Sequence, residues 1–159
     1  MQTLKVKVDV KPEQATALHE TMHKFNAACN YVAEKAYEMH TANKIKLQPF
    51  VYQDIRTKFG ISSQMAVRAI SKACEAYKRD KSIKPTFDPD GAVIYDQRIM
   101  SWKGLDQVSL LTLQGRVKLP IKICDYHAPR MDRIRGQSYL IFHKGSFYLC
   151  VVVEVPEPT

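Results

Sequence analysis

The sequence predicts an α+β fold in which a small β-barrel carries an inserted three-helix lobe. Residues 3–10 alternate between apolar and polar side chains, and residues 11–84 carry apolar side chains at helical spacing. Residues 85–159 form five β-rich runs separated by turns. These elements are most economically joined if the first strand belongs to the barrel. We therefore expect a barrel made of residues 1–10 and 85–159, and a lobe made of residues 11–84.

The first two elements are a strand and a long helix. Residues 3–10 place their apolar side chains on one side, which is typical of a half-buried strand. Pro12 suits the first position of a helix, and Asn43 is a reasonable place for that helix to stop. A narrow apolar seam between them predicts partner helices. The seam consists of Leu18, Met22, Phe25, Cys29, Val32, Ala36 and Met39.

A short second helix is predicted at residues 48–59, with Phe50, Ile55 and Phe59 facing inward. Gly60 would be its C-cap, because glycine readily adopts the left-handed conformation that ends a helix.

The third helix is predicted at residues 62–84, with Ser62 or Ser63 as its N-cap. One face is apolar and should be buried, and the opposite face is cationic. The apolar face consists of Val67, Ile70, Cys74 and Tyr77.

The remaining strands are predicted where β-branched and aromatic residues gather. Gln114-Gly115 and Lys144-Gly145 are expected to be tight hairpin turns. The segment 125–136 is basic and has little strand pattern, so it is either a loop or a short helix. The strand runs are 92–95, 108–113, 117–123, 138–143 and 147–155.

Charge restricts the partners of the chain. The 159 residues carry a net charge of +8, and residues 44–84 alone contain ten lysines and arginines against three acids. This pattern points to a polyanion, either nucleic acid or an acidic membrane surface. No apolar run is long enough to span a bilayer and the N-terminus lacks a signal-peptide pattern, so we expect a cytoplasmic protein with no membrane partner. The four widely spaced cysteines are expected to be buried free thiols.

Nucleic-acid binding also needs amides to read bases and aromatic rings to stack on them. Both predicted parts of the chain supply such groups beside their cations. The candidate residues are Asn26, Asn30, Tyr31, Tyr52, Gln53, Gln64, Arg68, Lys72, Lys78, Arg79, Tyr95, Arg98, Trp102, Arg116, Lys118 and Lys122.

The sequence His19-Glu20-Thr21-Met22-His23 matches the H-E-x-x-H motif of zinc peptidases. At this spacing, two imidazoles lie one helical turn apart and can bind one metal. No downstream histidine or glutamate has the context of a third ligand, and a peptidase would not explain the basic block. We therefore predict no metal site, with a zinc hydrolase as the alternative function.

Other catalytic patterns are also missing from the sequence. We find no carboxylates arranged for a two-metal nuclease site, no nucleophile signature and no phosphate-binding glycine-rich loop. The chain is therefore predicted to be non-catalytic on its own and to need no cofactor.

The order of segments resembles the N-terminal half of TnpB, the RNA-guided nuclease encoded by bacterial insertion sequences and related to miniature type V CRISPR effectors. The resemblance covers nearly the whole chain. It rests on the strand leading into KPEQATALHETMHKFNAACNYV, on SSQMAVRAISKACEAYK, KPTF, VIYDQR and VSLLTLQGRVKLPI, and on the closing GSFYLCVVVEVPEPT.

This resemblance implies an oligonucleotide-binding-like wedge barrel and a recognition lobe that hold a guide RNA and read a short DNA motif beside the target. Family members continue into a RuvC nuclease domain, which uses Mg²⁺ and is absent here. Cleavage would then need a RuvC part from a missing segment or a separate chain. The implied DNA contacts are Tyr52, Gln53, Gln64, Arg68 and Lys72. The implied RNA contacts are Asn26, Asn30, Lys78, Arg79, Arg98, Trp102, Arg116 and Lys118.

A third hypothesis is a protein-interaction module in which the long helix docks a partner.

Overall fold

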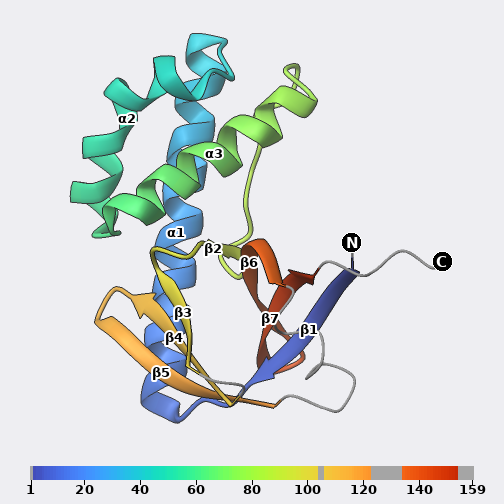
Figure 1. Ribbon diagram of the computed structural model, residues 1–159. Coiled ribbons are helices and arrows are strands. Elements are labelled where there is room, and N and C mark those ends of the chain that lie inside the picture. Colours follow the sequence, from blue (N-terminus) through green and yellow to red (C-terminus); the bar gives the residue numbers. More distant parts are fainter. Residues whose placement is uncertain (1, 104–105, 123–133, 154–159) are drawn as a thin grey trace, which may run out of the picture. The chain divides into compact units, whose positions relative to one another are not determined.

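The computed structural model describes residues 2–103, 106–122 and 134–153. The chain forms two compact units. The first, the β-unit, contains Met1–Leu18 and Ala92–Thr159, and the second, the helical unit, is His19–Gly91. Helix α1 (Pro12–Met39) begins in the β-unit and continues into the helical unit (Figure 1). Most of segment 125–136 lies outside the described residues, and its last three residues belong to a strand.

The β-unit is an antiparallel, nearly closed, barrel-like sheet with the strand order β2-β6-β7-β1-β5-β4-β3. The α+β prediction is therefore confirmed. The buried hydroxyl of Tyr95 on edge strand β2 donates a hydrogen bond to the carbonyl oxygen of Leu111 on β4 (2.8 Å), which links one edge of the sheet to the strand next to its other edge. The strands are β1 (Gln2–Val8), β2 (Val93–Tyr95), β3 (Met100–Lys103), β4 (Gln107–Thr112), β5 (Gly115–Lys122), β6 (Ile134–His143) and β7 (Ser146–Val153).

Six of these strands coincide with the predicted runs, and β3 was missed. With only four residues, one buried, two half-buried and one exposed, β3 has too little alternation to be recognised from sequence. Both predicted hairpins are present, but the first turns at Leu113-Gln114, one residue before the predicted pair Gln114-Gly115. Lys144 and Gly145 have φ angles of 50° and 81°, the left-handed pair that a two-residue hairpin requires.

Helix α1 begins at Pro12 as predicted, and its seam is fully buried from Leu18 to Ala36. Met39 is 40% exposed because it is the last residue of the helix. Asn43 does not end α1 but caps the next helix: its side-chain oxygen accepts hydrogen bonds from the N–H groups of Ile45 (2.9 Å) and Lys46 (3.2 Å).

Helix α2 (Lys44–Phe59) therefore begins one turn earlier than predicted and contains Pro49. Its buried residues are Leu47, Val51 and Ile55. The prediction that Phe50 faces inward is wrong, because its side chain is 60% exposed. The predicted helix began at residue 48 and so left out Leu47. The buried face is defined by the spacing of four residues from Leu47 to Val51 and from Val51 to Ile55.

Helix α3 (Ser63–Arg79) has Ser62 as its N-cap, and Gly60 caps the end of α2 with a φ of 68°, both as predicted. Ile70, Cys74 and Tyr77 are buried. Val67 is only half-buried, because small side chains occupy the centre of the inner face. These are Ala66, Ala69 and Ala73.

Candidate nucleic-acid interface

The clearest surface feature of the helical unit is a shallow groove along α2, with a volume of about 430 Å³. Its residues recur at spacings of three, one, three and one, so they form a continuous stripe on the helix. We call this set the α2 stripe. It consists of Ile45, Gln48, Pro49, Tyr52 and Gln53.

The α2 stripe combines apolar surface with amides and an aromatic ring. Ile45 is 83% exposed, and Gln48 and Gln53 are exposed amides. The guanidinium carbon of Arg56 lies 5.9 Å from the centroid of the half-buried Tyr52 ring. Tyr52 and Gln53, predicted from sequence as contact residues, are thus brought together here.

Cations surround the α2 stripe in the sequence and are accessible in the structure. Eight of the ten lysines and arginines between residues 44 and 84 are exposed. None of the eight forms an ion pair with another residue of the described part of the chain. Their repulsion is therefore not compensated by neighbouring carboxylates at salt-bridge distance. They are Lys44, Lys46, Arg56, Lys58, Lys78, Arg79, Lys81 and Lys84.

The predicted DNA contacts on α3 are less accessible than those on α2. Gln64, Arg68 and Lys72 are all half-buried. The Lys72 ammonium donates a hydrogen bond to the Asn26 side-chain oxygen (3.0 Å) and lies 5.4 Å and 5.2 Å from the ring centroids of Phe25 and Phe87. Burial lowers the pKa of Lys72. In this arrangement Lys72 is occupied within the fold.

Asn26 and Asn30 also have structural roles. Asn26 is fully buried, and its amide nitrogen donates to the carbonyl oxygens of Met22 (2.9 Å), Pro89 (3.3 Å) and Gly91 (2.9 Å). The Asn30 amide donates to the carbonyl of Phe87 (3.1 Å) and accepts from its N–H (2.7 Å). The expectation that both amides face a ligand does not hold in this structure, because they bind the backbone of residues 87–91 instead.

Among the predicted RNA contacts of the β-unit, Arg98, Arg116 and Lys118 are exposed and Trp102 is half-buried. Arg116 is held by two of its own neighbours: its guanidinium donates to the carbonyl oxygen of Arg98 (2.8 Å) and, at 3.4 Å, to the hydroxyl of Ser101. Arg116 and Arg98 are therefore joined on one surface, on β5 and just before β3.

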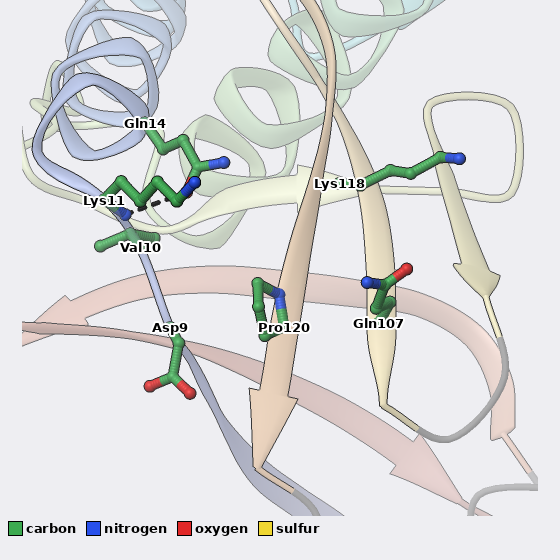
Figure 2. Close-up of a pocket in the computed structure, with 7 residues that line it drawn as sticks. All are labelled: Asp9, Val10, Lys11, Gln14, Gln107, Lys118 and Pro120. Carbon is green, nitrogen blue, oxygen red and sulfur yellow. Dashed lines mark hydrogen bonds between the residues drawn. The ribbon is translucent and has the colours of Figure 1, made fainter.

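Lys118 also lines a polar pocket of about 340 Å³ (Figure 2). Figure 2 shows Lys11 and Gln14 at the start of α1, where the Lys11 N–H donates to the Gln14 side chain (2.9 Å). Gln107 and Pro120 are paired residues of neighbouring strands. The carboxylate of Asp9 is part of the same lining and would repel phosphate. The pocket therefore carries both signs of charge, two lysines and one carboxylate.

The structure adds two basic residues of β1, Lys5 and Lys7, to the predicted Lys122. Lys7 is paired with Lys122 on one side and with Tyr148 on the other, and directly paired residues of antiparallel strands share a face. Lys5 lies with its ammonium 4.4 Å from the centroid of the Tyr148 ring. Alternation within β1 and β5 could have indicated this basic and aromatic row, but strand pairing was needed to assemble it.

The H-E-x-x-H histidines lie one turn apart near the start of the helical unit, with ring centroids 5.9 Å apart. The Nε2 atom of His23 is 2.9 Å from the Oδ1 atom of Asp90, and Nδ1 of His19 is 3.9 Å from the same oxygen. Asp90 was not considered as a partner in the sequence analysis, because 67 residues separate it from His23.

Cysteine positions agree with the expectation of free thiols where the structure describes them. Cys29 and Cys74 are buried and Cys150 is half-buried, and all three are free; Cys124 lies outside the described residues. Burial raises the pKa of Cys29 to about 12 and that of Cys74 to about 11.

Comparisons with known proteins do not identify this arrangement. No family model matches the chain, and no curated protein matches its sequence significantly. Within the described residues, no helix is both long enough and apolar enough to cross a bilayer.

Proposed function

We propose that the chain is a nucleic-acid-binding module that has no catalytic activity of its own. The observation that carries this proposal is the set of eight exposed cations in residues 44–84 that form no ion pair with a described residue. Clustered, uncompensated positive charge favours a polyanion, because neutralising phosphates releases counterions.

The α2 stripe supports nucleic acid over other polyanions. Tyr52 offers a ring for base stacking, and Gln53 and Gln48 offer amides that can pair with base edges. Arg56 lies beside the Tyr52 ring and is exposed, so it is placed to reach a phosphate next to a stacked base. The stripe is therefore the site at which we expect base contacts.

A more specific version of the proposal, which names the DNA and RNA contacts, follows from the resemblance to TnpB. The helical unit would read a short DNA motif through Tyr52, Gln53 and the accessible atoms of Gln64 and Arg68, and the β-unit would hold guide RNA through Arg98, Trp102, Arg116 and Lys118. Lys78 and Arg79 would contact the RNA backbone. A RuvC segment or partner chain would supply Mg²⁺-dependent cleavage. Asn26, Asn30 and Lys72 are left out of this surface, because they are bonded within the fold.

The test is a salt titration of binding to labelled single-stranded RNA and duplex DNA. We expect affinity to fall steeply with salt, and Arg56→Ala/Lys58→Ala to reduce the slope of log K against log salt by about 2 for DNA, since each phosphate contact contributes about 0.9. Tyr52→Ala should weaken single-strand binding about tenfold through lost stacking.

The matched control is Lys24→Ala/Lys35→Ala, which removes two lysines of α1 outside the basic block. It should leave the slope nearly unchanged. An equal loss in both double variants would show non-specific attraction and remove the α2 region from the site. The absence of binding at low salt would end the proposal. Sequencing of the RNA that co-purifies with the native protein tests the proposed binding of a guide RNA. That proposal predicts a single structured RNA species.

A further inference from the structure

We propose that His19, His23 and Asp90 form a zinc-binding site in the helical unit. This inference is independent of nucleic-acid binding. The three candidate ligand atoms lie within 4.8 Å of one another. Ligands of a tetrahedral zinc ion at about 2.0–2.1 Å lie about 3.3 Å apart, so modest side-chain rotations bring the three atoms onto one ion.

The convergence of two imidazoles on one carboxylate oxygen favours a metal. A hydrogen bond between His23 and Asp90, at 2.9 Å, needs only one histidine. His19 adds a second ring nitrogen at 3.9 Å from the same oxygen, beyond hydrogen-bonding distance. An ion among the three atoms accounts for both histidines, whose spacing of four residues places them on one face of α1.

The turn that carries Asp90 is fixed before any ion binds. The Asp90 N–H donates to the side chain of Asp88 (2.8 Å), and the Gly91 N–H donates to the Asp88 carbonyl (2.9 Å). On the helix side, the Asn26 amide bonds the carbonyls of Pro89 and Gly91.

The approach of this turn to α1 is close. A Cβ atom at Gly91 would lie 3.0 Å from the Asp88 carbonyl oxygen and 3.1 Å from the Asn26 side-chain oxygen. The backbone around Asp90 is therefore held against the helix by contacts unrelated to the histidines, which reduces the cost of ordering the ligands.

The ligand types indicate which metal would bind, and the positions of the ligands in the helical unit indicate what it would do. Two imidazoles and one carboxylate suit zinc, and three protein ligands leave one position for water. The side chains of His19, His23 and Asp90 are 33%, 51% and 51% exposed, so solvent and metal have access. His19 is the first residue of the helical unit and Asp90 the last but one. A bound ion would thus tie together the two ends of this unit and stabilise it.

The test uses the full chain, stripped of metal with a chelator and titrated with Zn²⁺ by calorimetry. We expect one equivalent to bind and the melting temperature to rise with zinc concentration. His19→Ala, His23→Ala and Asp90→Asn should each weaken binding tenfold or more. Two controls should bind as the parent does: Glu20→Gln inside the motif, and His40→Gln at the exposed end of α1.

Cobalt absorbance keeps the test decisive if a variant fails to fold. Co²⁺ bound to the parent chain should show ligand-field bands without a thiolate charge-transfer band, since no cysteine is in the proposed set. A thiolate band would overturn the assignment, as would binding that survives in His19→Ala/His23→Ala. Failure of the parent chain to bind Zn²⁺ would end the proposal, whatever the outcome of the nucleic-acid experiments.

Discussion

Two groups of polar residues in the helical unit have similar compositions but opposite environments. The α2 stripe and Arg56 present amides, a tyrosine and a cation to solvent along one helix. Asn26, Asn30 and Lys72 also offer amides and a cation, but they bond to one another or to the backbone of residues 87–91. We call this second group the amide cluster.

The difference shows that residue type does not separate a ligand contact from a structural contact. The Asn26 side chain forms hydrogen bonds with Met22, Pro89, Gly91 and Lys72, all of which belong to the chain itself. Buried amides bonded in this way stabilise the fold, because leaving their partners unsatisfied is costly. The residues of the α2 stripe do not have this structural role. We therefore expect their replacement to change nucleic-acid binding and not folding.

Among the polar residues of the two groups, the largest effect on stability is expected from Asn26→Ala. This change leaves the carbonyls of Pro89 and Gly91 and the Lys72 ammonium without the Asn26 amide, and we expect a loss of about 3 kcal/mol of unfolding free energy. Urea denaturation measures it, with Gln53→Ala in the stripe as the control that should change by less than about 0.5 kcal/mol. Equal effects in the two variants would remove the distinction between the groups.

An effect of intermediate size is expected from the Cys29 thiol, which should make the unfolding free energy depend on pH. Burial raises its pKa from the ordinary value of 9.0 to about 12. As pH rises, the Cys29 thiol loses its proton in the unfolded chain before it does so in the folded chain. Its contribution to the unfolding free energy is therefore complete below pH 9 and declines as pH rises toward 12. The decline is roughly 1 kcal/mol per pH unit for this thiol.

Denaturation of the parent chain and of Cys29→Ala between pH 8 and pH 11 measures this contribution. The stability difference between the two should narrow above pH 9. A difference that stays constant over this range would show that Cys29 keeps an ordinary pKa and that burial does not protect its thiol.

The smallest effect is expected for Phe50→Ser on α2. Because Phe50 is 60% exposed, the change should alter the unfolding free energy by less than about 0.5 kcal/mol. Ile55→Ser, five residues later and fully buried, should cost about 3 kcal/mol or more. Comparable losses in thermal melts would place Phe50 in the core after all and redefine the exposed face of the stripe helix.

Much of the fold was accessible from the sequence because local signals agreed with burial. The seam of α1, the Ser62 N-cap, the Gly60 C-cap and both hairpin turns are each encoded within a few residues. Where the predictions failed, the local signal was weak or ambiguous. The second helix begins at Lys44, after the N-cap Asn43, and not at residue 48 as predicted, and β3 is too short to show a period.

The candidate interface was only partly predictable. The basic block and the pair Tyr52-Gln53 follow from residue type, and the structure places them on accessible surface. Asn26 is bonded to the backbone of a turn 63 to 65 residues away in the sequence, and Lys72 is bonded to Asn26. No spacing rule predicts such pairings.

The sequence by itself determined most of the secondary structure, the mixed α+β class and the concentration of positive charge, because these depend on residue type and on short-range periodicity. Tertiary structure alone decided which polar groups are consumed by the fold and which carboxylate meets His19 and His23. Both outcomes depend on long-range backbone approach, above all on how closely Gly91 allows the turn of residues 88–91 to lie against α1.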